Sequence, residues 1–116
     1  MTTICLDHLQ INRAVTFAAR AQGLIGKAAL TSETGLWISP CNSVHTCFMR
    51  GAIDVVFISK TGVVLRVVEN LTPWRFAMRA KAVSVLELKS GQAKKLAIVE
   101  GSQLDFYPHE YQRRPA

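Results

Sequence analysis

Asp54 is the residue whose chemistry most needs an explanation, because it stands in a strongly apolar stretch, residues 53–58. A carboxylate in such a stretch is costly to bury unless other groups satisfy it. His45 and Arg50 lie near it in sequence, and Arg75 could reach it from a later loop. We therefore expect Asp54 to be paired. The cluster either binds a small polar or anionic ligand or forms an ion pair that fixes the turn before the strand.

A metal site is the second chemistry to consider, since Cys41, His45 and Cys47 could share one side of an extended segment. Zinc usually takes three or four such ligands at a fixed geometry. Pro40 interrupts the extension through Cys41, and the sequence offers no second ligand pair. We expect no metal and no cofactor, and we interpret Cys47 as a buried, inert side chain.

A nucleophilic pair of Cys47 and His45 is the third possibility. Side chains two apart on a strand lie side by side rather than converging, and no third residue is identified to orient the histidine. The cysteines are odd in number and form no CxxC pair, which indicates reduced thiols. A metal-dependent or hydrolytic enzyme that uses His45 and Asp54 stays an alternative, although the residues favour a protein without catalytic activity.

Aromatic and basic residues are interleaved in the segment that follows Pro73, which contains Trp74, Arg75, Phe76, Arg79 and Lys81. Rings interleaved with cations are what a single-stranded nucleic acid needs for stacking and charge neutralisation. Trp74 could equally cap the core, and no helix-turn-helix, zinc-finger or RNA-recognition motif is present. The formal net charge of +6 is mostly scattered, a mild anionic preference at most. Nucleic acid is therefore an unfavoured partner, and a protein or nucleic-acid adaptor stays an alternative.

Length and composition predict one small globular domain. The chain has 116 residues, of which 49% are hydrophobic and 19% charged, so a core can form without disulfides or a structural metal. The apolar runs are too short to cross a bilayer, and the first ten residues do not resemble a secretory signal. We predict a cytoplasmic protein, a monomer or weak dimer, with a single domain over residues 1–107 and a loose tail over residues 108–116.

The elements that position these residues are predicted to be mostly strands, in a mainly β (α+β) fold with a compact sandwich-like or barrel-like antiparallel sheet. A turn at Lys60-Thr61-Gly62 joins the most strongly patterned hairpin. Two short helices are expected over Phe17–Gln22 and from Gln92 to Leu96. The expected strands are Thr2–Leu6, Leu36–Ile38, Ser43–Met49, Ile53–Ser59, Val63–Glu69, Ala82–Leu88 and Gln103–Tyr107.

Several motifs, taken in order, resemble the domain-of-unknown-function 192 family. The resemblance runs from about Ala14 to Phe106, and the string from His45 to Phe57 is its most specific part. The motifs are Arg20 with Gly23-Leu24-Ile25-Gly26-Lys27, Gly35-Leu36-Trp37-Ile38, Val44-His45-Thr46-Cys47-Phe48-Met49-Arg50, Ile53-Asp54-Val55-Val56-Phe57-Ile58, Pro73-Trp74-Arg75, Val85-Leu86-Glu87-Leu88 with Gly91, and Gly101.

The resemblance implies a compact, mainly β domain of bacteria and archaea for which no biochemical activity is established. Two departures stand out: Ala52 replaces a common proline, and Cys47 occupies a position that is often aromatic, which argues against an essential thiol. The leading hypothesis is a binding or accessory module for a small polar or anionic ligand. Its candidate residues are His45, Met49, Arg50, Asp54, Trp74 and Arg75.

Overall fold

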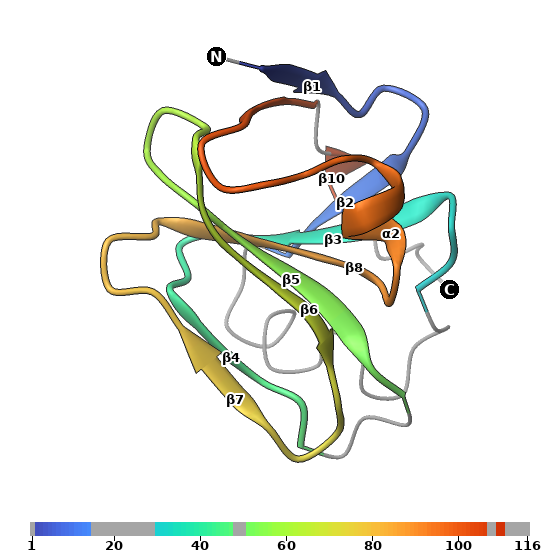
Figure 1. The fold of residues 1–116 in the computed structure, drawn as a ribbon, viewed down its shortest axis with the longest axis vertical. Helices are drawn as coiled ribbons and strands as arrows, with labels where there is room; N and C mark the ends of the chain where they lie inside the picture. Colours follow the sequence, from blue (N-terminus) through green and yellow to red (C-terminus); the bar gives the residue numbers. More distant parts are fainter. Residues whose placement is uncertain (1, 15–29, 48–50, 107–108, 111–116) are drawn as a thin grey trace.

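The computed structural model describes residues 2–14, 30–47, 51–106 and 109–110 (Figure 1). The helix expected over residues 17–22 lies outside them. The elements of the described residues are β1 (Thr3–Cys5), β2 (Gln10–Ala14), β3 (Thr34–Ile38), β4 (Ser43–His45), β5 (Ile53–Ile58), β6 (Val64–Leu71), β7 (Phe76–Met78), β8 (Ser84–Lys89), α2 (Gln92–Lys95), β9 (Gln103–Asp105) and β10 (His109–Glu110).

The strands form one six-stranded sheet and two small pairs. The order in the large sheet is β10-β2-β3-β8-β5-β6, and the pairs are β1-β9 and β4-β7. The predicted mainly β class is confirmed, and the sheets do not close into a barrel. Neighbours from β3 to β6 run antiparallel, as does β4-β7, whereas β10-β2, β2-β3 and β1-β9 are parallel. The sheet is therefore mixed rather than purely antiparallel.

The hairpin of β5 and β6 is confirmed, and its turn explains the glycine. Gly62 adopts a φ of 87°, a conformation that costs glycine little, and its N–H donates to the Ser59 carbonyl at 3.0 Å. β6 extends to Leu71, two residues beyond the predicted end. β4 ends at His45, whereas the prediction continued the strand to Met49, and residues 48–50 are outside the described range.

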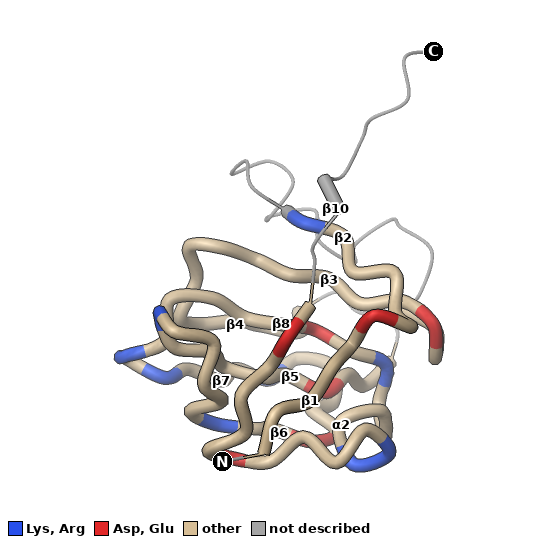
Figure 2. Tube along the Cα trace, turned by 90° about the horizontal axis from the view of Figure 1, so that it is seen from above, with Lys and Arg blue, Asp and Glu red and all other residues tan. Residues whose placement is uncertain are grey.

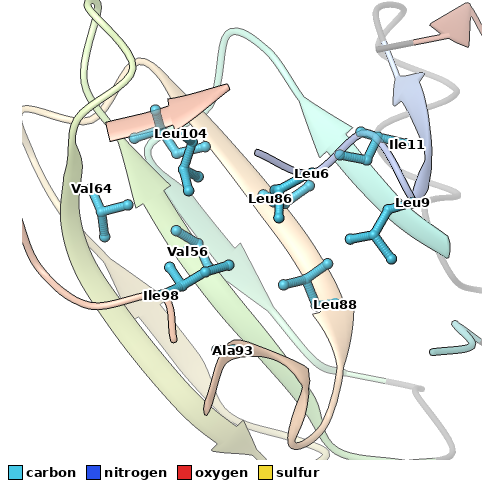
Figure 3. Close-up of a cluster of buried hydrophobic side chains, with 11 residues drawn as sticks. Leu6, Leu9, Ile11, Val56, Val64, Leu86, Leu88, Ala93, Ile98 and Leu104 are labelled. Atoms are coloured by element: carbon cyan, nitrogen blue, oxygen red, sulfur yellow. The ribbon is translucent and has the colours of Figure 1, made fainter. Parts of the chain in front are cut away.

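β5 is buried on both faces of the large sheet and divides the core in two. On one face Val56 packs with α2 and with β1-β9, in the cluster of Leu6, Leu9, Ile11, Val56, Ile58, Val64, Leu86, Leu88, Ala93, Ile98 and Leu104 (Figure 3). On the other face the β4-β7 pair packs its inward residues Val44 and Ala77 in the cluster of Val44, Ile53, Val55, Phe57, Leu71, Ala77, Ala82 and Val85. The helix and the β4-β7 pair thus cover opposite faces.

Within the described ranges, no helix has both the length and the apolar character needed to span a bilayer.

Candidate functional site: the outer face of the β4-β7 ribbon

Asp54 is fully buried, and its carboxylate is used by the backbone of the fold. Its Oδ1 accepts a hydrogen bond from the N–H of Asn70 at 2.8 Å, and its Oδ2 accepts from the N–H groups of Gly91 and Ala93, both at 2.9 Å. These amides belong to the end of β6 and the beginning of α2. The carboxylate is therefore satisfied, as expected, but these partners are backbone amides rather than a cationic side chain.

Asp54 lies on the α2 face of the sheet, because every second residue of β5 shares a face and Val56 and Ile58 lie on this one. Asp54 also accepts a hydrogen bond from Ala93 of the helix. His45 lies on the other side, in the β4-β7 pair. The structure therefore does not bring His45 and Asp54 together. Of the other predicted site residues, Met49 and Arg50 lie outside the described residues.

The remaining candidates lie in the β4-β7 pair, which we call the ribbon, or in the turn that leads into β7. His45 is exposed and lies directly opposite Phe76 in the register of the two strands. The exposed fractions of the neighbouring side chains are 62% for Trp74, 64% for Phe76 and 46% for Met78. Arg75 is exposed between the two aromatic residues. Three predicted residues, His45, Trp74 and Arg75, are thus exposed in or next to the ribbon, together with Phe76 and Met78. Phe76 belongs to the aromatic and basic segment of the sequence, whereas Met78 was not a candidate.

Thr46 holds this surface in place, and sequence reasoning missed it. Its buried hydroxyl donates to the Thr72 carbonyl at 2.6 Å and accepts from the N–H of Arg75 at 2.8 Å. Its backbone N–H donates to the Arg75 carbonyl at 2.9 Å, and its carbonyl accepts from the N–H of Trp74 at 3.1 Å. Trp74 has a φ of 65°, which non-glycine residues seldom adopt. Thr46 thereby fixes the turn that presents Trp74 and Arg75.

Replacing Thr46 with valine is expected to lower the free energy of unfolding by about 2 kcal/mol, since the partly buried Arg75 N–H and Thr72 carbonyl both lose the hydroxyl as a partner. Urea denaturation followed by circular dichroism measures this loss. Thr3→Val, at an exposed position of β1, makes the same chemical change and is expected to have almost no effect. Equal stability of the two variants would contradict the role given to the Thr46 hydroxyl.

Basic side chains surround the ribbon. Arg66 of β6 donates from Nη1 to the Met78 carbonyl at 2.7 Å, and Arg79 and Lys81 follow β7 with exposed side chains. Figure 2 shows segments of Lys and Arg, in blue, on the side of the molecule where β7 lies. We call Arg66, Arg75, Arg79 and Lys81 the basic rim. An exposed apolar centre inside a basic rim is suited to hold an anionic partner.

The cysteines do not form a metal site in the described part of the chain. Cys5 is exposed, and Cys41 and Cys47 are partly buried. The Sγ atom of Cys41 donates to the Ser43 carbonyl at 3.0 Å. The described residues contain no group of three or more histidine, cysteine, aspartate or glutamate residues that could hold a metal ion.

Glu87 is the second buried carboxyl group, and it was not predicted as a candidate. It lies on β8 between Leu36 of β3 and Val55 of β5, with 4% of its surface exposed. Burial raises the pKa of Glu87 from 4.5 to about 7, because removal from water disfavours the charged form. Its Oε2 atom has no hydrogen-bond partner among the residues that the structure describes. The available signal was a glutamate inside the apolar string Val85-Leu86-Glu87-Leu88.

Comparisons with known proteins agree with this fold. The sequence profile of the domain-of-unknown-function 192 family, described as "Uncharacterized ACR", matches residues 3–106 and confirms the resemblance. A crystal structure of a protein of unknown function from Novosphingobium aromaticivorans superposes with a TM-score of 0.72 at 24% identity, covering 80% of this chain and 71% of its own.

A second crystal structure, of a protein from Sinorhizobium meliloti named "putative transcription regulator", has a TM-score of 0.72 at 23% identity and covers 80% of this chain and 78% of its own. At these identities the likeness shows a shared fold. Among curated proteins, none matches the chain.

Proposed function

The chain belongs to the domain-of-unknown-function 192 family, and we propose that it acts as a binding module that takes an acidic protein partner on the ribbon. The observation that carries the proposal is the exposure of Trp74 and Phe76, at 62% and 64%, beside the basic rim. Large aromatic side chains and arginine are enriched where proteins bind each other. Aromatic area exposed to this extent beside cations therefore supports a protein partner on this surface.

The exposure of these side chains favours a macromolecule over the small ligand that the sequence suggested. Small-molecule sites are concave and bury most of the surface of their ligand. The ribbon instead presents its side chains outward, and the buried Asp54, an expected member of a small-ligand site, is held by α2 on the opposite face. The proposed partner is therefore anionic, as the sequence suggested, but it is a protein rather than a small ligand.

An acidic protein is favoured over nucleic acid because of the residues at the centre of the ribbon. Phe76 and Met78 are two residues apart on β7, so their exposed apolar side chains lie on the same face of the ribbon. His45 lies opposite Phe76 on β4. Methionine, aromatic residues and arginine are enriched at protein interfaces relative to the rest of the surface. Single-stranded nucleic acid needs a basic groove that follows its backbone. The transcription-regulator name of the Sinorhizobium meliloti protein makes an oligonucleotide a necessary comparison.

The proposal predicts that removing two cations of the rim weakens binding of an acidic probe. A fluorescein-labelled peptide that alternates Glu with Val and Phe serves as the probe, and fluorescence anisotropy measures its Kd. Arg75→Ala combined with Arg79→Ala is expected to weaken binding about tenfold, with a weaker salt dependence than the wild type. The matched control is Lys94→Ala with Lys95→Ala, which removes the same charge from exposed positions of α2.

Two results would contradict the proposal. Equal losses in the two double variants would show that the peptide responds to net charge rather than to the ribbon. Tighter binding of a labelled single-stranded oligonucleotide than of the acidic peptide, lost in the ribbon variant alone, would replace the protein partner with a nucleic acid.

A further inference from the structure

The hydrogen bonds inside the ribbon determine which backbone groups of β7 point away from it. Arg79 donates its N–H to the Asn42 carbonyl at 2.9 Å, and the Thr46 N–H donates to the Arg75 carbonyl at 2.9 Å. In an antiparallel pair, bonded and non-bonded residue pairs alternate. The backbone N–H and carbonyl groups of Phe76 and Met78 therefore face outward, on the edge of β7 away from β4.

Only part of this edge is occupied within the described residues. The Met78 carbonyl accepts the hydrogen bond from Arg66 at 2.7 Å, which also shows that it points away from β4. In the described part of the chain, β7 pairs with β4 alone. Among the described residues, the N–H and carbonyl of Phe76 and the N–H of Met78 therefore have no hydrogen-bond partner and are open to another chain. An open strand edge of this kind is a template for pairing with a second chain.

From this geometry we infer that β7 binds its partner by strand addition: an extended acidic segment of another protein pairs with the outer edge of β7. The residue of that segment opposite Phe76 donates its N–H to the Phe76 carbonyl and accepts the Phe76 N–H with its own carbonyl. The residue opposite Met78 accepts a hydrogen bond from the Met78 N–H. The inference rests on the proposed function and specifies its binding mode.

Charge complementarity selects an acidic segment. Arg66 reaches the edge itself, and a guanidinium has five N–H donors, so it can bind the Met78 carbonyl and a carboxylate together. Arg75 and Arg79 flank the strand on either side of Phe76 and Met78, with exposed side chains. In an added strand, one set of alternate side chains would contact Phe76, and the other set would lie near the cations of the basic rim.

The substitution Met78→Pro tests the outer edge of β7 by changing this protein rather than the probe. Met78→Pro removes the outward N–H without removing a hydrogen bond to β4, and proline is tolerated on edge strands for this reason. Met78→Ala also loses the methionine side chain but keeps the N–H. With the Glu/Val/Phe peptide as probe, Met78→Pro is expected to bind at least about tenfold more weakly than Met78→Ala. Circular dichroism of both variants verifies that the fold is retained.

Backbone methylation of the probe tests the edge independently of any folding defect. Two peptides of identical sequence carry N-methyl groups on one or the other set of alternate residues. Only one set faces β7 in an added strand, so one peptide is expected to lose at least about tenfold in affinity, and the other to bind like the parent peptide.

The outcomes separate the binding mode from the function. If both methylated peptides and Met78→Pro bind like their controls while Arg75→Ala/Arg79→Ala does not, strand addition is wrong and the ribbon still binds acidic partners. If both methylated peptides lose affinity equally, pairing along one edge is also wrong. If the wild type binds no acidic peptide, the proposed function fails, and the inference fails with it.

Discussion

Replacement of Asp54 with asparagine is expected to lower the free energy of unfolding by about 3 kcal/mol or more. The carboxylate is fully buried and accepts three backbone hydrogen bonds, from Asn70, Gly91 and Ala93. An asparagine side chain has one oxygen, and its amino group would place donors against donors at the second position. At least one amide would lose its acceptor, and the remaining bonds would lose their charge.

Urea denaturation of Asp54→Asn and of Asp105→Asn measures this effect with a matched control. Asp105 is an exposed residue of β9, so the same chemical change is expected to alter stability by less than about 0.5 kcal/mol. Amide hydrogen exchange adds a local readout, because Gly91 and Ala93 should exchange faster in Asp54→Asn. Equal stability of the two variants would mean that the three hydrogen bonds contribute nothing to folding.

The same variant distinguishes an anchoring Asp54 from one that belongs to the binding site. Asp54 lies on the α2 face, and the ribbon covers the other face. The folded fraction of Asp54→Asn is therefore expected to bind the acidic peptide with the affinity of the wild type. A selective loss of affinity with unchanged stability would return Asp54 to the site that the sequence suggested.

Local sequence was sufficient for the parts of the fold that depend on neighbouring residues. The β5-β6 hairpin has two β-branched runs joined by a short turn, and Gly62 supplies the positive φ that this turn needs. Strand β8 was likewise recognisable from its apolar run. In both cases the determining contacts are local or depend on simple alternation.

The site was less predictable because its contacts connect distant parts of the chain. The partners of Asp54 are backbone amides 16, 37 and 39 residues away, and an amide carries no side-chain signal. The hydroxyl of Thr46 reaches residues 26 and 29 positions away. β7 has three residues in a region of alternating arginine and aromatic residues, and it becomes a strand only by pairing with β4. Tertiary pairing here outweighs local propensity.

Glu87 leads to the second large prediction, which concerns pH. Burial raises the pKa of its carboxyl from 4.5 to about 7, so between these pH values the folded chain holds a proton that the unfolded chain has released. Stability falls with rising pH wherever the folded state binds more protons. The free energy of unfolding is therefore expected to fall by about 3 kcal/mol between pH 4.5 and pH 7, and Glu87 adds no further change above that range.

Glu87→Gln removes the titrating group while keeping the shape of the side chain. The variant is expected to lose this part of the pH dependence, so that at pH 8 it is more stable than the wild type by about 2–3 kcal/mol, while near pH 4.5 the two are similar. Urea denaturation across this pH range gives both curves, and their difference removes the contribution of other groups. Glu69→Gln, at an exposed position of β6, should follow the wild type throughout. If the difference between the Glu87→Gln and wild-type curves stayed constant from pH 4.5 to pH 8, the buried carboxyl would have to ionise without cost. That result requires a cation or donor to satisfy Oε2 in solution, and it would replace desolvation as the determinant of the pKa.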